Sequence, residues 1–407
     1  MKTTYIRTKE ILEMFHLTRQ TLHNWVRLGL ITEPDKDWRG WRMWTEQHIE
    51  QIKQTIKQKE EQLTLPITRE QKLQINNRRY LGSKYKLLDF IWKVASEHCK
   101  NVHTVADIFA GTGVVANKFN LEGKRVIVND ILQSNYYAYY TWFSNEKTDK
   151  EKVSQLIYEW NETEVEADNY VSKHFGGTYF TTYNARKIGY IREEIEKLTG
   201  EINFREKAIL ITSLLYAMDK VANTVGHYDA YRRKLDSVKK IRLLIPEYND
   251  EFNEGNLIFK EDANQLIRKI HADLVYIDTP YNSRQYGDAY HLLENIAEWK
   301  QPEVTGVAKK MVDRNHLKSD YCTIKATNAF HDLVSHIDAK YILVSYNNMA
   351  QKGVGRSNAK ISAEEIIHIL KTRGDVRMFE TDFQVYTTGK TNIEDHKEIL
   401  YFCKINH

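Results

Sequence analysis

Apolar residues in this chain gather in short runs that are hydrophobic on both faces. Such runs lie at 104–109, 125–129, 273–277 and 341–346. Strands of this kind suit the centre of a parallel sheet that helices cover, so they predict a doubly wound α/β domain over residues 77–407. Two further runs, 380–386 and 398–403, flank a polar loop and predict an antiparallel hairpin at one edge of the sheet.

Residues 140–255 contain no apolar run of this type, only helical patterns such as 184–198 and 204–223. We therefore expect a helical insert within the α/β domain. Residues 63–76 are polar and include Pro66, which predicts a linker in front of that domain.

The first 62 residues have the pattern of a separate small domain. Thr8 and Thr18 are each suited to cap a helix, and the few residues between the two helices allow only a tight turn. One apolar face runs along each helix: Ile11, Leu12 and Phe15 in the first, and Leu22, Trp25 and Val26 in the second. A short glycine hairpin at 38–44 follows, and Thr45 opens a third helix. The pattern predicts an all-α helix-turn-helix domain with a wing.

This order of elements resembles the helix-turn-helix-wing head of MerR-family regulators over residues 4 to about 60. The resemblance implies that the second helix enters the major groove of DNA and that the wing touches the backbone. It thereby places five side chains near DNA: Gln20, His23, Asn24, Arg39 and Arg42. A three-helix protein-interaction head is the alternative. The apolar spacing of the third helix lasts only about two heptads, which leaves the oligomeric state open.

Length and composition narrow the class of protein. A chain of 407 residues suits two or three domains, and no run approaches the 18 apolar residues of a membrane span. The start lacks the apolar stretch of a signal peptide, so we place the protein in the cytoplasm. Cys99, Cys322 and Cys403 lie far apart and are expected to be buried thiols. No spacing of histidines or cysteines indicates a metal site.

The charge is unevenly distributed. Lysines and arginines number 59 against 55 acids, a net charge of +4, which is mild for a nucleic-acid binder. Residues 231–242 hold six basic side chains and one acid, and residues 309–318 hold four and one. Such clusters can neutralise phosphates, although a solvated helix face explains either cluster equally well.

A glycine-containing strand end lies at residues 107–113. Gly111 and Gly113 allow a tight turn and a close approach of a cofactor to the backbone. The third glycine of a dinucleotide-binding motif is absent, which disfavours a nicotinamide cofactor. Asp130 follows the next strand and is positioned for the hydroxyl pair of a ribose, or alternatively for capping the helix behind it.

The tetrapeptide Asp278-Thr279-Pro280-Tyr281 follows another predicted strand and is the most diagnostic feature of the sequence. Methylation of an exocyclic amine requires hydrogen-bond acceptors for the amino hydrogens and a surface that clamps the ring. The Asp278 carboxylate and the Thr279 carbonyl supply acceptors, Pro280 stiffens the turn, and Tyr281 supplies a stacking face. A base in a duplex reaches such a site only when it is flipped out.

Together these pieces resemble the adenine-N6 DNA methyltransferases of the Dam type, and more closely the methylases of restriction systems of the FokI kind. Segments 77–84, 107–113, 129–130, 259–263 and 278–286 follow the order of that family, and the resemblance spans residues 76–403. One departure is Thr279, where proline is commoner. The resemblance implies a Rossmann-like sheet that binds S-adenosylmethionine.

The resemblance also assigns roles to residues. Tyr80 and Lys84 would lie by the cofactor, Asp130 on its ribose and Asp262 on its adenine. Four residues would surround its methionine part: Asp107, Phe109, Gly111 and Gly113. The insert would recognise the target, with five candidate DNA contacts: His227, Tyr228, Arg232, Arg233 and Lys234.

The predicted function is methyl transfer from S-adenosylmethionine to the N6 amino group of adenine in duplex DNA. The context would be the modification half of a restriction system, with a cognate restriction endonuclease encoded separately. Two alternatives stay open: a transcription regulator in which the methyltransferase domain is secondary, and a methyltransferase for RNA or for cytosine N4.

Overall fold

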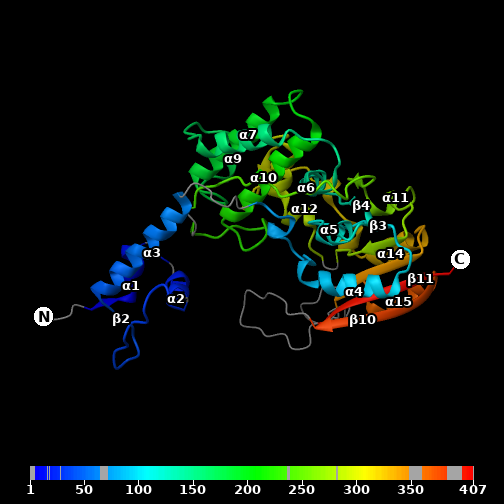
Figure 1. The fold of residues 1–407 in the computed structure, drawn as a ribbon, viewed down its shortest axis with the longest axis horizontal. Coiled ribbons are helices and arrows are strands. Elements are labelled where there is room, and N and C mark those ends of the chain that lie inside the picture. Colours follow the sequence, from blue (N-terminus) through cyan, green and yellow to red (C-terminus); the bar gives the residue numbers. More distant parts are fainter. Residues whose placement is uncertain are drawn as a thin grey trace. The chain divides into compact units, whose positions relative to one another are not determined.

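The computed structural model describes residues 5–15, 17, 19–27, 29–64, 72–235, 239–280, 283–347, 360–382 and 397–406. The chain divides into two compact units, residues 1–71 and 72–407 (Figure 1).

The smaller unit contains three helices and a two-stranded sheet. Its elements are β1 Ile6–Arg7, α1 Thr8–Met14, α2 Arg19–Arg27, β2 Met43–Trp44 and α3 Glu46–Thr64. Side chains from every part of the unit form its core: Ile11, Leu22, Trp25, Ile31, Trp44 and Ile52. A wing precedes β2, closed by a bridge between Lys36 and Arg42 and turning at Gly40, whose φ is +78°. The predicted helix-turn-helix with a wing is confirmed.

Three details of this unit differ from the prediction. It is not all-α, because β1 pairs with β2. Thr8 is the first residue of α1, not its cap, and its hydroxyl accepts a hydrogen bond from Trp44 Nε1 at 3.0 Å; Thr18 lies outside the described residues. The predicted linker 63–76 extends too far toward the C-terminus, because Leu73 already belongs to the larger unit. Leu73 is buried there and exchanges backbone hydrogen bonds with Ile245 and Glu247.

The larger unit is built on a seven-stranded sheet of order β10-β11-β9-β6-β3-β4-β5. Its strands are β3 Thr104–Asp107, β4 Arg125–Asn129, β5 Leu257–Phe259, β6 Leu274–Ile277, β9 Tyr341–Asn347, β10 Gly374–Asp382 and β11 Lys397–Ile405. The five strands β5, β4, β3, β6 and β9 pair in parallel in that order, and β11 runs antiparallel to both β9 and β10. The α/β class and the edge hairpin are confirmed; residues 383–386 of that hairpin lie outside the described residues.

Helices cover both faces of this sheet. One face packs on α4 Leu88–His98, α5 Val114–Leu121 and α6 Gln133–Phe143, and the other on α11 Ala263–Leu266, α14 Ala326–Ser335 and α15 Ala363–Lys371. Side chains alternate between the faces as the strand period of two requires, so Val105 faces the first core and Ala106 the second. Short 3₁₀ turns occupy Ile75–Asn77, Tyr85–Leu87, Asn315–Leu317 and Asp320–Cys322.

The insert is helical. Its helices are α7 Lys150–Glu162, α8 Tyr170–Phe175, α9 Thr182–Lys197 and α10 Phe204–Val221, and α7, α9 and α10 are grouped together in Figure 1. Residues 140–255, apart from the undescribed 236–238, form no strand. The insert shares one hydrophobic core with α12 Tyr286–Ala289 and α13 His291–Glu298, which follow β6 in the chain. Among the described helices, none is long and apolar enough to cross a membrane.

Candidate active site

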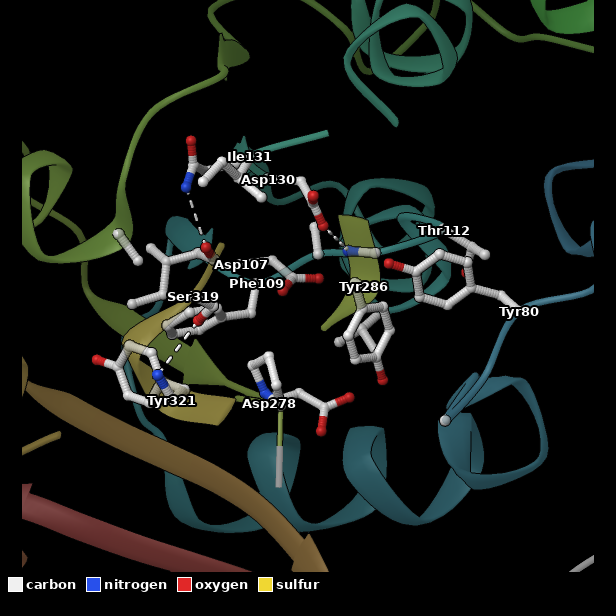
Figure 2. A pocket seen from close by; sticks show the side chains of 18 of the residues that line it. Tyr80, Asp107, Phe109, Thr112, Asp130, Ile131, Asp278, Tyr286, Ser319 and Tyr321 are labelled. Atoms are coloured by element: carbon white, nitrogen blue, oxygen red, sulfur yellow. Dashed lines mark hydrogen bonds between the residues drawn. The ribbon is translucent and has the colours of Figure 1, made fainter. Parts of the chain in front are cut away.

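A pocket of about 980 Å³, including the part open to solvent, lies at the carboxyl ends of β3, β4 and β6. Parallel strands bring their carboxyl ends to one edge of the sheet, which is where open α/β sheets bind ligands. The pocket is lined by Asp107 after β3, Asp130 after β4 and Asp278 after β6. Figure 2 shows these carboxylates around one space, together with Tyr80, Phe109, Tyr286 and Tyr321. Seven of the eight predicted cofactor residues line this pocket: Tyr80, Lys84, Asp107, Phe109, Gly111, Asp130 and Asp262.

The two glycines after β3 contact different parts of the structure. Both adopt a left-handed conformation, with φ of +53° at Gly111 and +79° at Gly113. A Cβ at Gly111 would lie 2.9 Å from the Tyr80 ring, so the turn and this pocket wall fit only around glycine. Gly113, the eighth predicted cofactor residue, faces the protein core instead, because a Cβ there would meet Phe143 at 3.1 Å. It caps α5 and is absent from the pocket lining.

Two pocket carboxylates are held with acceptor capacity to spare. Asp130 accepts hydrogen bonds from the Leu132 and Gly111 backbone amides, at 2.9 and 3.2 Å. Burial nevertheless raises the pKa of Asp130 to about 6. Asp107 accepts one bond, from the Ala116 amide at 3.2 Å, and its buried Oδ1 has no hydrogen-bond partner in the described part of the chain. Burial, followed by the charge of Asp278, raises the pKa of Asp107 well above its usual value.

Asp278 is part of a buried charged triad. Lys84 Nζ lies 2.9 Å from Asp278 Oδ1 and 3.3 Å from Glu398 Oε1, on the antiparallel strand β11. Burial raises the pKa of Asp278 to about 6, and the lysine opposes this effect while Glu398 adds to it. The sequence suggested that Lys84 lies by the cofactor, and it does line the pocket, but its ammonium group is paired with the carboxylates of Asp278 and Glu398. Glu398 has no local sequence signal that would have identified it.

Aromatic residues form much of the pocket wall. The Tyr80 ring stacks on Tyr290 with centroids 4.8 Å apart, and Tyr286 leans against both. Across the pocket, Phe109 meets Tyr321 edge to face at 5.0 Å. The sequence did not identify Tyr286 or Tyr321 as site residues, although Tyr286 closes the segment that resembles the family after the tetrapeptide.

The structure describes two of the three remaining catalytic candidates. Pro280 lines the pocket and Thr279 is buried directly behind Asp278. Tyr281 lies outside the described residues, so its stacking role stays a prediction. The three cysteines are free and buried, as expected. In the ranges that the structure describes, no cluster of three or more His, Cys, Asp or Glu residues has the geometry to hold a metal ion.

The predicted DNA contacts separate into exposed and buried groups. Tyr228 was predicted wrongly: its ring is buried, and its hydroxyl donates to Asp219 Oδ1 at 2.7 Å. His227 is half-buried, whereas Arg232, Arg233 and Lys234 are exposed.

In the small unit, His23 and Arg39 are exposed, and the Arg39 guanidinium lies 4.3 Å from the Trp38 ring. Arg42 is engaged with Glu33 at 2.8 Å. The side chains of Gln20 and Asn24 are not among those described.

The fold and the pocket define the class. The site combines a glycine turn, an acid after the neighbouring strand and an Asp-x-Pro turn with hydrogen-bond acceptors. These features are typical of an α/β enzyme that binds a nucleoside-type cofactor and a planar substrate with an amino group. The family model "D12 class N6 adenine-specific DNA methyltransferase" matches residues 80–353, and the model "MerR HTH family regulatory protein" matches residues 6–69. This chain belongs to the D12 class of adenine-specific DNA methyltransferases.

Relatives of known name agree with this membership. The modification methylase StsI of Streptococcus sanguinis is 36% identical over 79% of this chain and 50% of its own length. The type II methyltransferase M.NlaIII of Neisseria lactamica is 31% identical over 78% of this chain and 95% of its own. M.FokI of Planomicrobium okeanokoites is 32% identical over 80% and 52%. The chain thus spans about half the length of StsI and M.FokI and nearly all of M.NlaIII.

The cofactor of this class is S-adenosylmethionine, and the pocket residues fit it. Asp107 Oδ1, which has no hydrogen-bond partner among the described residues, can accept a hydrogen bond from the cofactor. The Asp130 carboxylate can accept from ribose hydroxyls, and Phe109 provides an apolar contact surface. Tyr80 closes the wall beside the glycine turn.

Proposed function

We propose that this protein transfers a methyl group from S-adenosylmethionine to the N6 amino group of adenine at a specific sequence in duplex DNA. The observation that carries the proposal is the position of Asp278, at the end of β6 in the same pocket as Asp107 and Asp130. An acceptor for an amino group and acceptors for a nucleoside-type cofactor therefore share one space.

The chain's own residues divide the work. Asp107, Asp130 and Phe109 bind the cofactor, which supplies an electrophilic methyl group on a sulfonium. Asp278 accepts a hydrogen bond from the adenine amino group, and the Thr279 carbonyl accepts the other amino hydrogen. These bonds orient the nitrogen lone pair and increase its nucleophilicity. Lys84 keeps Asp278 ionised at neutral pH by its charge at 2.9 Å.

The substrate must be extruded to reach this position. Asp278 lines the pocket and only 17% of its side chain is exposed, so a base stacked within a duplex cannot contact it. Tyr281 is the proposed stacking partner of the extruded ring. The helix-turn-helix unit binds the duplex as a separate element, and its resemblance to regulators supports this assignment.

The biological context follows from the kind of relatives. We assign the protein to the modification half of a restriction system that acts in the cytoplasm, paired with an endonuclease encoded separately. A transcription regulator is the second candidate, favoured by the match of residues 6–69 to regulatory proteins. The two are distinguished by a protein that starts at about Leu65, which is expected to keep methylating DNA if the helix-turn-helix unit only regulates or adds affinity. Asp278→Ala is expected to leave operator binding intact.

Incubation of the full-length protein with labelled S-adenosylmethionine and mixed-sequence duplex DNA tests the proposal. Label is expected in N6-methyladenine, and Asp278→Ala is expected to remove it although circular dichroism shows that the variant is folded. Label confined to cytosine, or to RNA supplied in parallel, would refute the proposal. Sequencing of the methylated sites identifies the recognition sequence.

A further inference from the structure

The basic cluster at 309–318 belongs to a segment that borders the pocket. We name residues 302–322 the rim segment. It contains a small hairpin of β7 Val304–Thr305 and β8 Lys310–Met311, and it ends with Leu317, Lys318, Ser319 and Tyr321 in the pocket wall. It follows the catalytic tetrapeptide in the chain and so lies outside the insert that was expected to recognise DNA.

One border of the rim segment is fixed to the chain just after the tetrapeptide. The Gln285 side chain donates to the Ser319 carbonyl at 3.1 Å and accepts from the Ser319 amide at 2.8 Å. Gly287 fits against Leu317 only because it lacks a Cβ, which would lie 2.4 Å from Leu317 Cβ. The hydrogen bonds of Gln285 and the close packing of Gly287 therefore fix the geometry of the pocket wall at residues 317–319.

The other border is fixed to the insert. The Tyr179 hydroxyl lies 2.9 Å from the Ala308 carbonyl in the hairpin turn, and the Tyr179 ring packs edge to face against Tyr231 at 5.1 Å. Tyr231 immediately precedes the exposed basic residues Arg232, Arg233 and Lys234. The hairpin turn and the candidate DNA contacts of the insert consequently share one anchor.

The four cations of the cluster differ in whether they form ion pairs. Lys310 is paired with Asp229 of the insert at 2.9 Å, and Arg314 is paired with Asp288. These two hold the rim segment in place. Lys309 and Lys318 form no ion pair with any described residue, and Lys318 is exposed where it lines the pocket. Lys309 is further held in a left-handed conformation, with φ of +51°, where a lysine is disfavoured.

We infer that the rim segment is a second DNA-binding element, in which Lys309 and Lys318 bind backbone phosphates of the duplex beside the pocket. Lys318 is an exposed cation in the pocket wall, and Lys309 is a half-buried cation in the anchored hairpin turn of the same segment. Cations on such a support match the charge of DNA next to an extruded base. The inference rests on the proposed function. It extends the contact surface from residues 232–234 of the insert to the mouth of the pocket.

Titration of a mixed-sequence DNA duplex at 50–200 mM salt tests the inference with the full-length protein. Each phosphate contact adds about 0.9 to the slope of log affinity against log salt. Lys309→Ala and Lys318→Ala are each expected to lose that increment, so that between 50 and 200 mM the wild type weakens about 3.5-fold more than either variant. Lys371→Ala is the matched control, because Lys371 is an exposed residue at the end of α15, outside the pocket lining, and it is expected to keep the full slope.

Two further measurements separate binding from other effects. Lys309→Gly relieves the left-handed strain, so it is expected to raise the melting temperature while it lowers the salt slope. Affinity for S-adenosylhomocysteine is expected to be unchanged in Lys309→Ala, because Lys309 does not line the pocket. Unaltered slopes in both alanine variants overturn the inference, as does a Lys318→Ala defect confined to S-adenosylhomocysteine. Reduced slopes with no methylation by the wild type would instead refute the proposed function, while still showing that Lys309 and Lys318 contact phosphates.

Discussion

Replacing Lys84 with methionine tests the most specific electrostatic feature of the site. The substitution removes the ammonium from between Asp278, 2.9 Å away, and Glu398, 3.3 Å away, and leaves an apolar chain of similar length. An opposite charge at this range lowers the pKa of a carboxyl group by about 1–3 units. The pKa of Asp278, about 6 with the lysine present, is therefore expected to rise to about 7–9 without it.

The effect on the reaction follows from the sign of this shift. Asp278 must be ionised to accept from the amino group, so activity is lost as the pH falls through its pKa. With a pKa of about 6, about 90% of Asp278 is ionised at pH 7, and with a pKa near 8 only about 10% is. Lys84→Met is expected to lower the single-turnover rate at pH 7 about tenfold and to recover at higher pH.

The assay is the pH profile of single-turnover methylation, with saturating cofactor and DNA. Glu398→Gln gives the opposite sign, because Glu398 raises the pKa of Asp278, and its acid limb is expected to move to lower pH. Lys84→Arg keeps the charge and should retain most of the wild-type profile. An acid limb of Lys84→Met that coincides with the wild type, combined with weakened binding of S-adenosylhomocysteine, would refute the role of Lys84 as partner of Asp278.

Three other substitutions give defined outcomes. Asp130→Asn is expected to weaken S-adenosylhomocysteine binding and to abolish its decline as the pH falls through about 6, the pKa of Asp130; calorimetry that finds the same decline in the variant contradicts this. Gly111→Ala adds a Cβ 2.9 Å from the Tyr80 ring at a φ of +53°, and is expected to cost at least about 1–2 kcal/mol in urea unfolding, so an unchanged midpoint argues against the tight fit. Tyr228→Phe removes a buried hydrogen bond to Asp219 and should cost about 1–3 kcal/mol with no change in the salt slope of DNA binding, whereas a changed slope would restore Tyr228 as a DNA contact.

The sheet was predictable because its central strands carry their own signal. β4 and β6 are apolar on both faces, so burial of the whole run is encoded locally. β5 has only three residues at the sheet edge, one of them exposed, and gives no such signal. The tetrapeptide at 278–281 was equally visible, because its chemistry depends on adjacent residues.

Contacts between distant segments were not predictable from local pattern. Lys84, which precedes the 3₁₀ turn Tyr85–Leu87, meets Asp278, which follows β6, only in the folded chain, and Glu398 joins them from the antiparallel strand β11. The sequence around Tyr228 combines polar, aromatic and basic residues, as DNA-binding loops do, yet its tyrosine is buried. Composition does not distinguish a tyrosine that meets DNA from one that satisfies a buried carboxylate.

That buried carboxylate, Asp219 on α10, explains why the insert is not a detachable recognition module. Arg78 Nε lies 3.9 Å from Asp219 Oδ2, and its guanidinium contacts the faces of Tyr80 and Tyr290 at the cofactor pocket. A buried cation that loses its carboxylate costs about 3–5 kcal/mol, a large part of the stability of a typical domain. Under the proposed recognition of DNA by the insert, we expect changes of DNA specificity to be confined to its exposed positions. The helix that carries Asp219 must stay in place, because it supports the wall of the pocket in which the chemistry occurs.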